Sequence, residues 1–112
     1  MIQKIDYKAL QTKLNENKVT AIIDCYTDWC KYCVLLAPVL DELSKEMEGK
    51  IEFCKINTDE NPDFAREYEV MSLPTILFIK EGKIVEKKAG FIPKEAIMEI
   101  INSKMLDTAT VN

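Results

Sequence analysis

Two cysteines stand two residues apart in TDWCKYC (27–33), next to the only tryptophan of the chain. A Cys-x-x-Cys pair can ligate a metal ion, close a structural disulfide or exchange electrons with another disulfide. The chain has no histidine, which excludes imidazole-ligated zinc sites and nucleophiles activated by histidine. The elements around Cys30 and Cys33 must therefore indicate which of these roles applies.

The pair lies where a predicted strand gives way to a predicted helix. Residues 19–26 form the largely apolar run VTAIIDCY, which is typical of a strand buried on both faces. A helix is expected to follow from about Cys30 to Met47, with Pro38 kinking it. Its apolar stripe steps by three or four residues and consists of Leu36, Leu40, Leu43 and Met47.

This placement predicts different chemistry for the two sulfurs. At a helix N-terminus, unpaired N–H groups and the positive end of the dipole favour a thiolate at Cys30. Cys33 lies one turn further on and can reach the first sulfur. We expect Cys30 to be exposed and activated and Cys33 to be partly buried. That arrangement suits thiol-disulfide exchange, in which Cys33 resolves a mixed disulfide formed by Cys30.

The remaining pattern predicts an α/β domain. Strand, helix and strand in succession imply parallel strands joined by a right-handed crossover. The 112 residues fit one domain, 1–112, with a frayed tail over 106–112. The other expected elements are a helix from Asp6 to about Asn17, a strand over 51–57, a short helix beginning at Asn61-Pro62, strands over 75–80 and 84–89 with a hairpin at 81–83, and a helix from about Pro93.

Charge and hydropathy limit the partners. A net charge of -4 is a poor match to nucleic acid or anionic lipid, and no apolar run is long enough to cross a bilayer. The first 18 residues lack the apolar core and cleavage site of a signal peptide. We therefore expect a cytoplasmic protein that binds neither nucleic acid nor membranes.

The other two cysteines leave alternatives open. Cys25 and Cys54 fall on separate predicted strands, where they are most simply small core residues. They could also form a structural disulfide, or add ligands to the pair for zinc or an iron-sulfur cluster, since Cys25, Cys30 and Cys33 are spaced C-x4-C-x2-C. The apolar strand around Cys25 argues against a cluster-wrapping loop.

The stretch DCYTDWCKYC resembles the active site of the thioredoxin family, and the likeness continues along the chain. KINTDENPDFAREYEV is similar to the third strand and third helix of that family, and Pro38 stands where its helix-kinking proline stands. Leu73-Pro74-Thr75 resembles its cis-proline segment, with Gly82 and Gly90 as its later glycines. The resemblance implies a thioredoxin fold, a central mixed sheet of four to five strands flanked by about four helices.

Asp24 is a carboxyl inside the first buried strand, where it is costly unless it is paired or protonated. It either escapes to solvent at the strand end or serves as a general base near Cys33. Burial should raise its pKa toward the working range, and Lys55 on the adjacent strand should oppose that shift. The family carries Asp and Lys at these positions, which supports the role in proton transfer.

The resemblance also implies a substrate groove. A cis bond at Pro74 would set the Leu73 backbone against the cysteines, where it could pair with an extended substrate. An apolar patch is expected beside it, formed by Trp29, Tyr26, Met71, Gly90 and Phe91.

The departure from the family lies between the cysteines, where Lys31-Tyr32 replaces the usual Gly-Pro. Positive charge at Lys31 should favour the Cys30 thiolate and make the protein more oxidising than its Gly-Pro relatives. Tyr32 adds bulk that should narrow substrate choice.

We therefore expect a monomeric protein-disulfide reductase that needs no cofactor or metal. The resemblance implies disulfide-containing clients and a thioredoxin reductase or equivalent electron donor. The alternatives are a dedicated oxidoreductase with one partner, an oxidant or isomerase of an oxidising compartment, a metal or cluster module, and a scaffold that binds without exchange.

Overall fold

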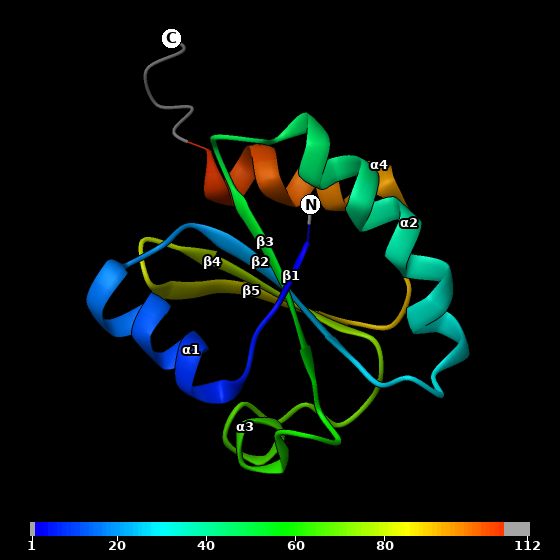
Figure 1. The fold of residues 1–112 in the computed structure, drawn as a ribbon. Helices are drawn as coiled ribbons and strands as arrows, with labels where there is room; N and C mark the ends of the chain where they lie inside the picture. The colour runs from blue at the N-terminus through cyan, green and yellow to red at the C-terminus, as the bar shows by residue number, and fades with distance from the viewer. Residues whose placement is uncertain (1, 107–112) are drawn as a thin grey trace, which may run out of the picture.

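The computed structural model describes residues 2–106 as a five-stranded sheet covered by helices on both faces (Figure 1). The strands are β1 (Gln3–Lys4), β2 (Ala21–Tyr26), β3 (Glu52–Asn57), β4 (Thr75–Lys80) and β5 (Lys83–Ala89). The helices are α1 (Tyr7–Thr12), α2 (Lys31–Glu46), α3 (Pro62–Glu67) and α4 (Lys94–Ile100). Short π-helical segments extend α1 and α4, namely η1 (Lys13–Asn17) and η2 (Ile101–Met105).

The sheet is mixed and has the order β1-β3-β2-β4-β5. β3 pairs in parallel with both β1 and β2, whereas β4 is antiparallel to β2 and to β5. The predicted mixed α/β sheet is therefore confirmed, but β1 was not predicted. Two residues are too few to show a strand periodicity, and it is the pairing of Gln3 with Cys54 and of Lys4 with Lys55 that makes this segment a strand.

Alternation along β2 divides the core into two layers. Ile22 packs with the α2 stripe of Leu36, Leu40 and Leu43, together with α4 and η2. Ile23 and Cys25 belong to the other core, which includes residues of α1 and α3. Figure 1 shows the same division, with α2 and α4 on one face of the sheet and α1 and α3 on the other. Because side chains alternate, Asp24 lies on the face covered by α2.

The predicted boundaries of α2 are confirmed to within its caps. Cys30 is the N-cap, Met47 is the C-cap, and Pro38 lies inside the helix. Gly49 follows with a φ of +85°, the left-handed conformation that favours glycine after a helix.

The β4–β5 hairpin is tighter than expected. Lys83 already belongs to β5, so the loop is Glu81-Gly82, whose φ values of 50° and 83° match a type I′ turn. The Gly82 N–H donates to the Val19 carbonyl at 2.8 Å. A Cβ at position 82 would lie 2.6 Å from the Leu14 carbonyl oxygen, so this loop is seated closely against the end of η1.

The predicted tail is wrong at its first residue. The Leu106 N–H donates to the Ile101 carbonyl at 3.0 Å, and its side chain packs against the α2-side core. The rest of the predicted tail, 107–112, lies outside the described residues. No helix within 2–106 combines the length and the apolar character needed to span a bilayer.

Candidate active site

The two active-site sulfurs meet at the first turn of α2. Cys30 has an extended backbone, with φ -87° and ψ 114°, and its Sγ accepts a hydrogen bond from the Cys33 N–H at 3.2 Å. A side chain that caps a helix N-terminus in this way receives donated hydrogen bonds and the positive end of the helix dipole. Both thiols are free. The predicted placement of the pair at a helix start is confirmed.

The expected exposure of Cys30 is wrong. Cys30 is 7% exposed and Cys33 is 4% exposed, so both are buried. The Cys30 side chain turns back to accept from the Cys33 N–H, and the surrounding chain covers it. The difference between the two sulfurs therefore lies in their hydrogen bonding and surroundings, and hardly in their solvent access.

Cys33 is held as a thiol. Burial, with a smaller contribution from contact with Cys30, raises the pKa of Cys33 to about 12, while the backbone N–H of Thr27 works in the opposite direction. Two of the causes depend on the free Cys30 sulfur, as a hydrogen-bond partner and as a neighbouring charge. The charge on Cys30 is lost once its sulfur is bound in a disulfide, which removes one of the causes that keep Cys33 protonated.

Asp24 is a buried carboxyl on the α2 side of β2. It is 5% exposed, and burial raises its pKa from 3.8 to about 7, while the charge on Lys55 opposes the shift without cancelling it. Asp24 and Lys55 are direct neighbours in the β2–β3 register. The Lys55 ammonium lies 5.4 Å from the centroid of the Tyr26 ring. The expected upward shift of the Asp24 pKa is thus confirmed. The alternative expectation, that the Asp24 side chain escapes to solvent at the strand end, is wrong.

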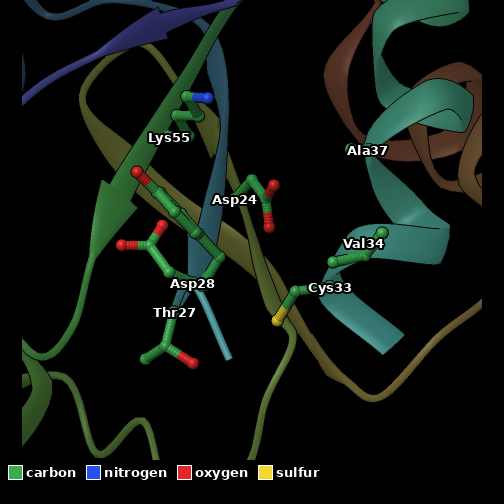
Figure 2. A pocket seen from close by; sticks show the side chains of 8 residues that line it. Asp24, Thr27, Asp28, Cys33, Val34, Ala37 and Lys55 are labelled. Atoms are coloured by element: carbon green, nitrogen blue, oxygen red, sulfur yellow. The ribbon is translucent and has the colours of Figure 1, made fainter. Parts of the chain in front are cut away.

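A pocket of about 230 Å³ connects this carboxyl with the resolving sulfur. Figure 2 shows the Asp24 carboxyl and the Cys33 sulfur projecting from β2 and α2 into the space between them. Eight residues line it: Asp24, Tyr26, Thr27, Asp28, Cys33, Val34, Ala37 and Lys55. Tyr26, which was expected in the apolar patch beside the substrate groove, is half-buried and lines this pocket instead. Thr27 and Val34 were not predicted, and only their spacing from Cys30 and Cys33 could have marked them.

The Leu73–Pro74 peptide bond is cis, as predicted. The Pro74 carbonyl accepts from the Gly90 N–H at 2.7 Å, which joins the start of β4 to the end of β5. The Thr75 hydroxyl donates to the Ser72 carbonyl at 2.6 Å. These bonds fix the chain on both sides of Leu73, which is half-buried.

Several large apolar side chains are exposed, some of them next to the cysteines in the sequence and others on later segments of the chain. Met71 is 91% exposed and Trp29 is 73% exposed, and the Trp29 Nε1–H donates to Asp59 Oδ2 at 2.7 Å. Asp59 was not predicted, because nothing in its local sequence distinguishes it from the acids around it. Other large exposed apolar side chains are Tyr32, Val34, Leu35, Phe91 and Ile84. The charged neighbour of Tyr32, Lys31, is exposed as well.

Cys25 and Cys54 are buried in the opposite core, among residues of α1 and α3. Burial raises the pKa of both thiols, that of Cys54 to about 12. The C-x4-C-x2-C spacing does not gather these sulfurs, because Cys25 points to the face of the sheet away from α2. Both are free thiols, so the alternative disulfide between them is wrong.

Comparison with known proteins decides the family. The family model described as Thioredoxin matches residues 1–103. This chain belongs to the thioredoxin family. The thioredoxin of Bacillus subtilis (strain 168) is 41% identical over 104 residues, which cover 93% of this chain and 98% of that protein. A Staphylococcus aureus (strain N315) thioredoxin is 43% identical over 84 residues, covering 75% and 81%.

The thioredoxin fold is also shown by a solved structure. Chloroplastic thioredoxin z, at 34% identity, superposes with a TM-score of 0.81 and coverages of 90% and 91%. The chain is therefore a thiol-disulfide oxidoreductase with the activity of a protein-disulfide reductase. Thioredoxins are the reference system for Cys-x-x-Cys exchange, so the general mechanism is that of the family. Such proteins act on disulfide-containing clients and are recharged by an electron donor.

Proposed function

We propose that Cys30 is the attacking nucleophile and Cys33 the resolving thiol of this reductase. The observation that carries the assignment is the hydrogen bond from the Cys33 N–H to Cys30 Sγ at the N-cap of α2. Donated hydrogen bonds and the helix dipole stabilise negative charge on the sulfur that receives them. Cys33 has the opposite environment, because burial raises its pKa to about 12.

The reaction then has two steps. The Cys30 thiolate attacks one sulfur of a client disulfide, forming the Cys30–client bond and releasing the other client sulfur as a thiolate. Cys33 loses its proton and attacks Cys30 Sγ, which forms the Cys30–Cys33 bond and breaks the bond to the client. The client leaves with both electrons and is reduced to the dithiol, while the protein is oxidised to the disulfide.

Asp24 is the proton acceptor for Cys33 in this proposal. Its carboxyl lines the same pocket as Cys33, and its pKa of about 7 allows it to accept and release a proton near neutral pH. Lys55 limits the rise of that pKa and so keeps part of the carboxyl ionised.

Clients dock beside the pair. Met71 and Trp29 supply exposed apolar surface, and the fixed backbone of Leu73 supplies hydrogen-bonding groups to an extended client segment. Phe91 and Gly90 border this surface from the end of β5, and Tyr32 narrows it from α2.

We propose a monomer that works in the reducing cytoplasm, where four unpaired thiols in one small domain are typical. Its donor is a thioredoxin reductase or an equivalent enzyme.

Trapping with Cys33→Ser tests the roles of the two cysteines. This variant should form a mixed disulfide with client proteins through Cys30 and should fail to release them, whereas Cys30→Ser should trap nothing. Many trapped proteins indicate a general reductase, and a single one indicates a dedicated oxidoreductase. Trapping by Cys30→Ser in place of Cys33→Ser would reverse the assignment.

A further inference from the structure

The lysine at position 87, on the edge strand β5, reaches across to the end of α3. Its Nζ donates to the Tyr68 carbonyl and to the Glu69 carbonyl, each at 3.1 Å. Lys87 pairs with Leu77 in the β4–β5 register, and Leu77 belongs to the core that contains residues of α1 and α3. Because residues paired across two strands share a face of the sheet, Lys87 lies on the same side as α3.

The turn that receives these two hydrogen bonds has an uncommon backbone conformation. Glu69 has a φ of +52°, in the left-handed region that residues other than glycine seldom adopt. The Val70 N–H donates to the Ala65 carbonyl at 2.9 Å and the Glu69 N–H donates to the Arg66 carbonyl at 3.3 Å, which is the Schellman arrangement of a helix C-terminus. The two carbonyls that Lys87 bonds have no partner within this arrangement. The ammonium therefore supports a left-handed turn that has no glycine to relieve it.

The loop of residues 68–74 that begins at this turn carries the surface proposed for clients. Met71 lies in it and is 91% exposed, and the backbone of Leu73 was assigned to an extended client segment. At its other end the loop is joined to β5 again, because the Gly90 N–H donates to the Pro74 carbonyl at 2.7 Å. β5 thus holds this loop at both ends.

We propose that Lys87 is a positioning residue for client binding, which acts by fixing the loop of residues 68–74 at the end of α3. The inference rests on the client surface proposed above and adds a residue outside it. Removal of the ammonium leaves both carbonyls to water and lets the turn depart from its left-handed conformation, which displaces Met71. Exchange at the Cys30 sulfur does not need Lys87, because Cys30 is held by the N-cap of α2.

The next residue of β5 offers a matched control. Lys88 is exposed like Lys87, but it pairs with Ile76, which belongs to the core on the α2 side. Its side chain therefore lies on the face of the sheet away from α3. Lys88→Met removes the same charge from the same strand as Lys87→Met does, so a general electrostatic effect on a charged client would appear in both variants.

Two disulfides of different size separate docking from exchange. The reduced protein is mixed with excess insulin, a protein disulfide that needs a docking surface, and in parallel with a small aromatic disulfide that meets little besides the Cys30 sulfur. The ratio of the insulin rate constant to the small-disulfide rate constant measures docking. Lys87→Met should lower this ratio about three- to tenfold, the range expected for losing a surface hydrogen bond, and Lys88→Met should change it by less than about twofold.

Two further measurements connect the loss to the turn itself. Lys87→Arg should restore the ratio to within about twofold of wild type, since the guanidinium keeps the charge and can donate to both carbonyls. Hydrogen exchange at the Val70 amide should become about three- to tenfold faster in Lys87→Met and should not change in Lys88→Met, because this amide is bonded within the turn that Lys87 supports.

An unchanged ratio for Lys87→Met would overturn the inference. So would an equal fall in Lys88→Met, which would indicate a general effect of charge, and so would equal slowing with both disulfides, which would place the effect at the cysteines. Failure of the wild-type protein to reduce insulin would instead refute the proposed function.

Discussion

The buried carboxyl of Asp24 makes the stability of this protein depend on pH in an unusual direction. Burial raises its pKa from 3.8 to about 7. Between these values the unfolded chain carries an ionised Asp24 and the folded chain carries a protonated one, so folding takes up a proton. The folded state therefore loses stability as pH rises through this window, and the loss is complete above about pH 7.

The magnitude follows from the two pKa values. A pKa difference of about 3 between the folded and unfolded states lowers the free energy of unfolding by about 4 kcal/mol at pH 8 and by about 1.5 kcal/mol at pH 5. Asp24→Asn is neutral at every pH and should be more stable than wild type at pH 8. Because the buried amide also needs partners, we expect a gain of up to about 4 kcal/mol. The gap should shrink by about 2 to 3 kcal/mol between pH 8 and pH 5.

Urea unfolding of the reduced protein measures this gap, with Trp29 fluorescence as the reporter because the chain has one tryptophan. Asp28→Asn is the control, since Asp28 lines the same pocket and is exposed. It should change stability by less than about 0.5 kcal/mol at either pH. A gap for Asp24→Asn that stays constant with pH, or that widens toward acid, would refute the assignment of a buried, proton-binding carboxyl.

Three further predictions concern other parts of the molecule. Gly82→Ala should destabilise by about 2 kcal/mol or more in thermal unfolding, because its φ is +83° and the new Cβ would meet a backbone oxygen at 2.6 Å; Gly49→Ala, which meets nothing within 4 Å, should lose only about 1 kcal/mol. Replacing Lys31-Tyr32 by Gly-Pro should lower the potential by about 10 to 30 mV in equilibrium with glutathione, and an unchanged or higher potential would contradict the charge argument. In thiol titration with an aromatic disulfide, Cys25 and Cys54 should react only in denaturant, because both are buried in the core that contains residues of α1 and α3. Reaction in the native state would show that this core opens.

The local elements of the site could be predicted because each depends on neighbours along the chain. The stripe of Leu36, Leu40 and Leu43 defines α2, and the strand before it ends where the cysteines begin. Asp24 was recognisable as a misplaced charge inside an apolar strand. The cis-proline segment was recognised by resemblance, since cis bonds are too uncommon at proline for local sequence to predict them.

Sequence by itself determined the type of chemistry, because a Cys-x-x-Cys pair at a helix start depends only on residue spacing and helix geometry. Tertiary structure decided how that chemistry is arranged. Packing placed Asp24, Thr27 and Cys33 around one pocket and Cys25 on the opposite face, since β2 alternates its side chains between two cores. It also buried Cys30, whose exposure was predicted wrongly, because burial depends on what the rest of the chain lays over a residue. Spacing along a chain contains no information about that covering.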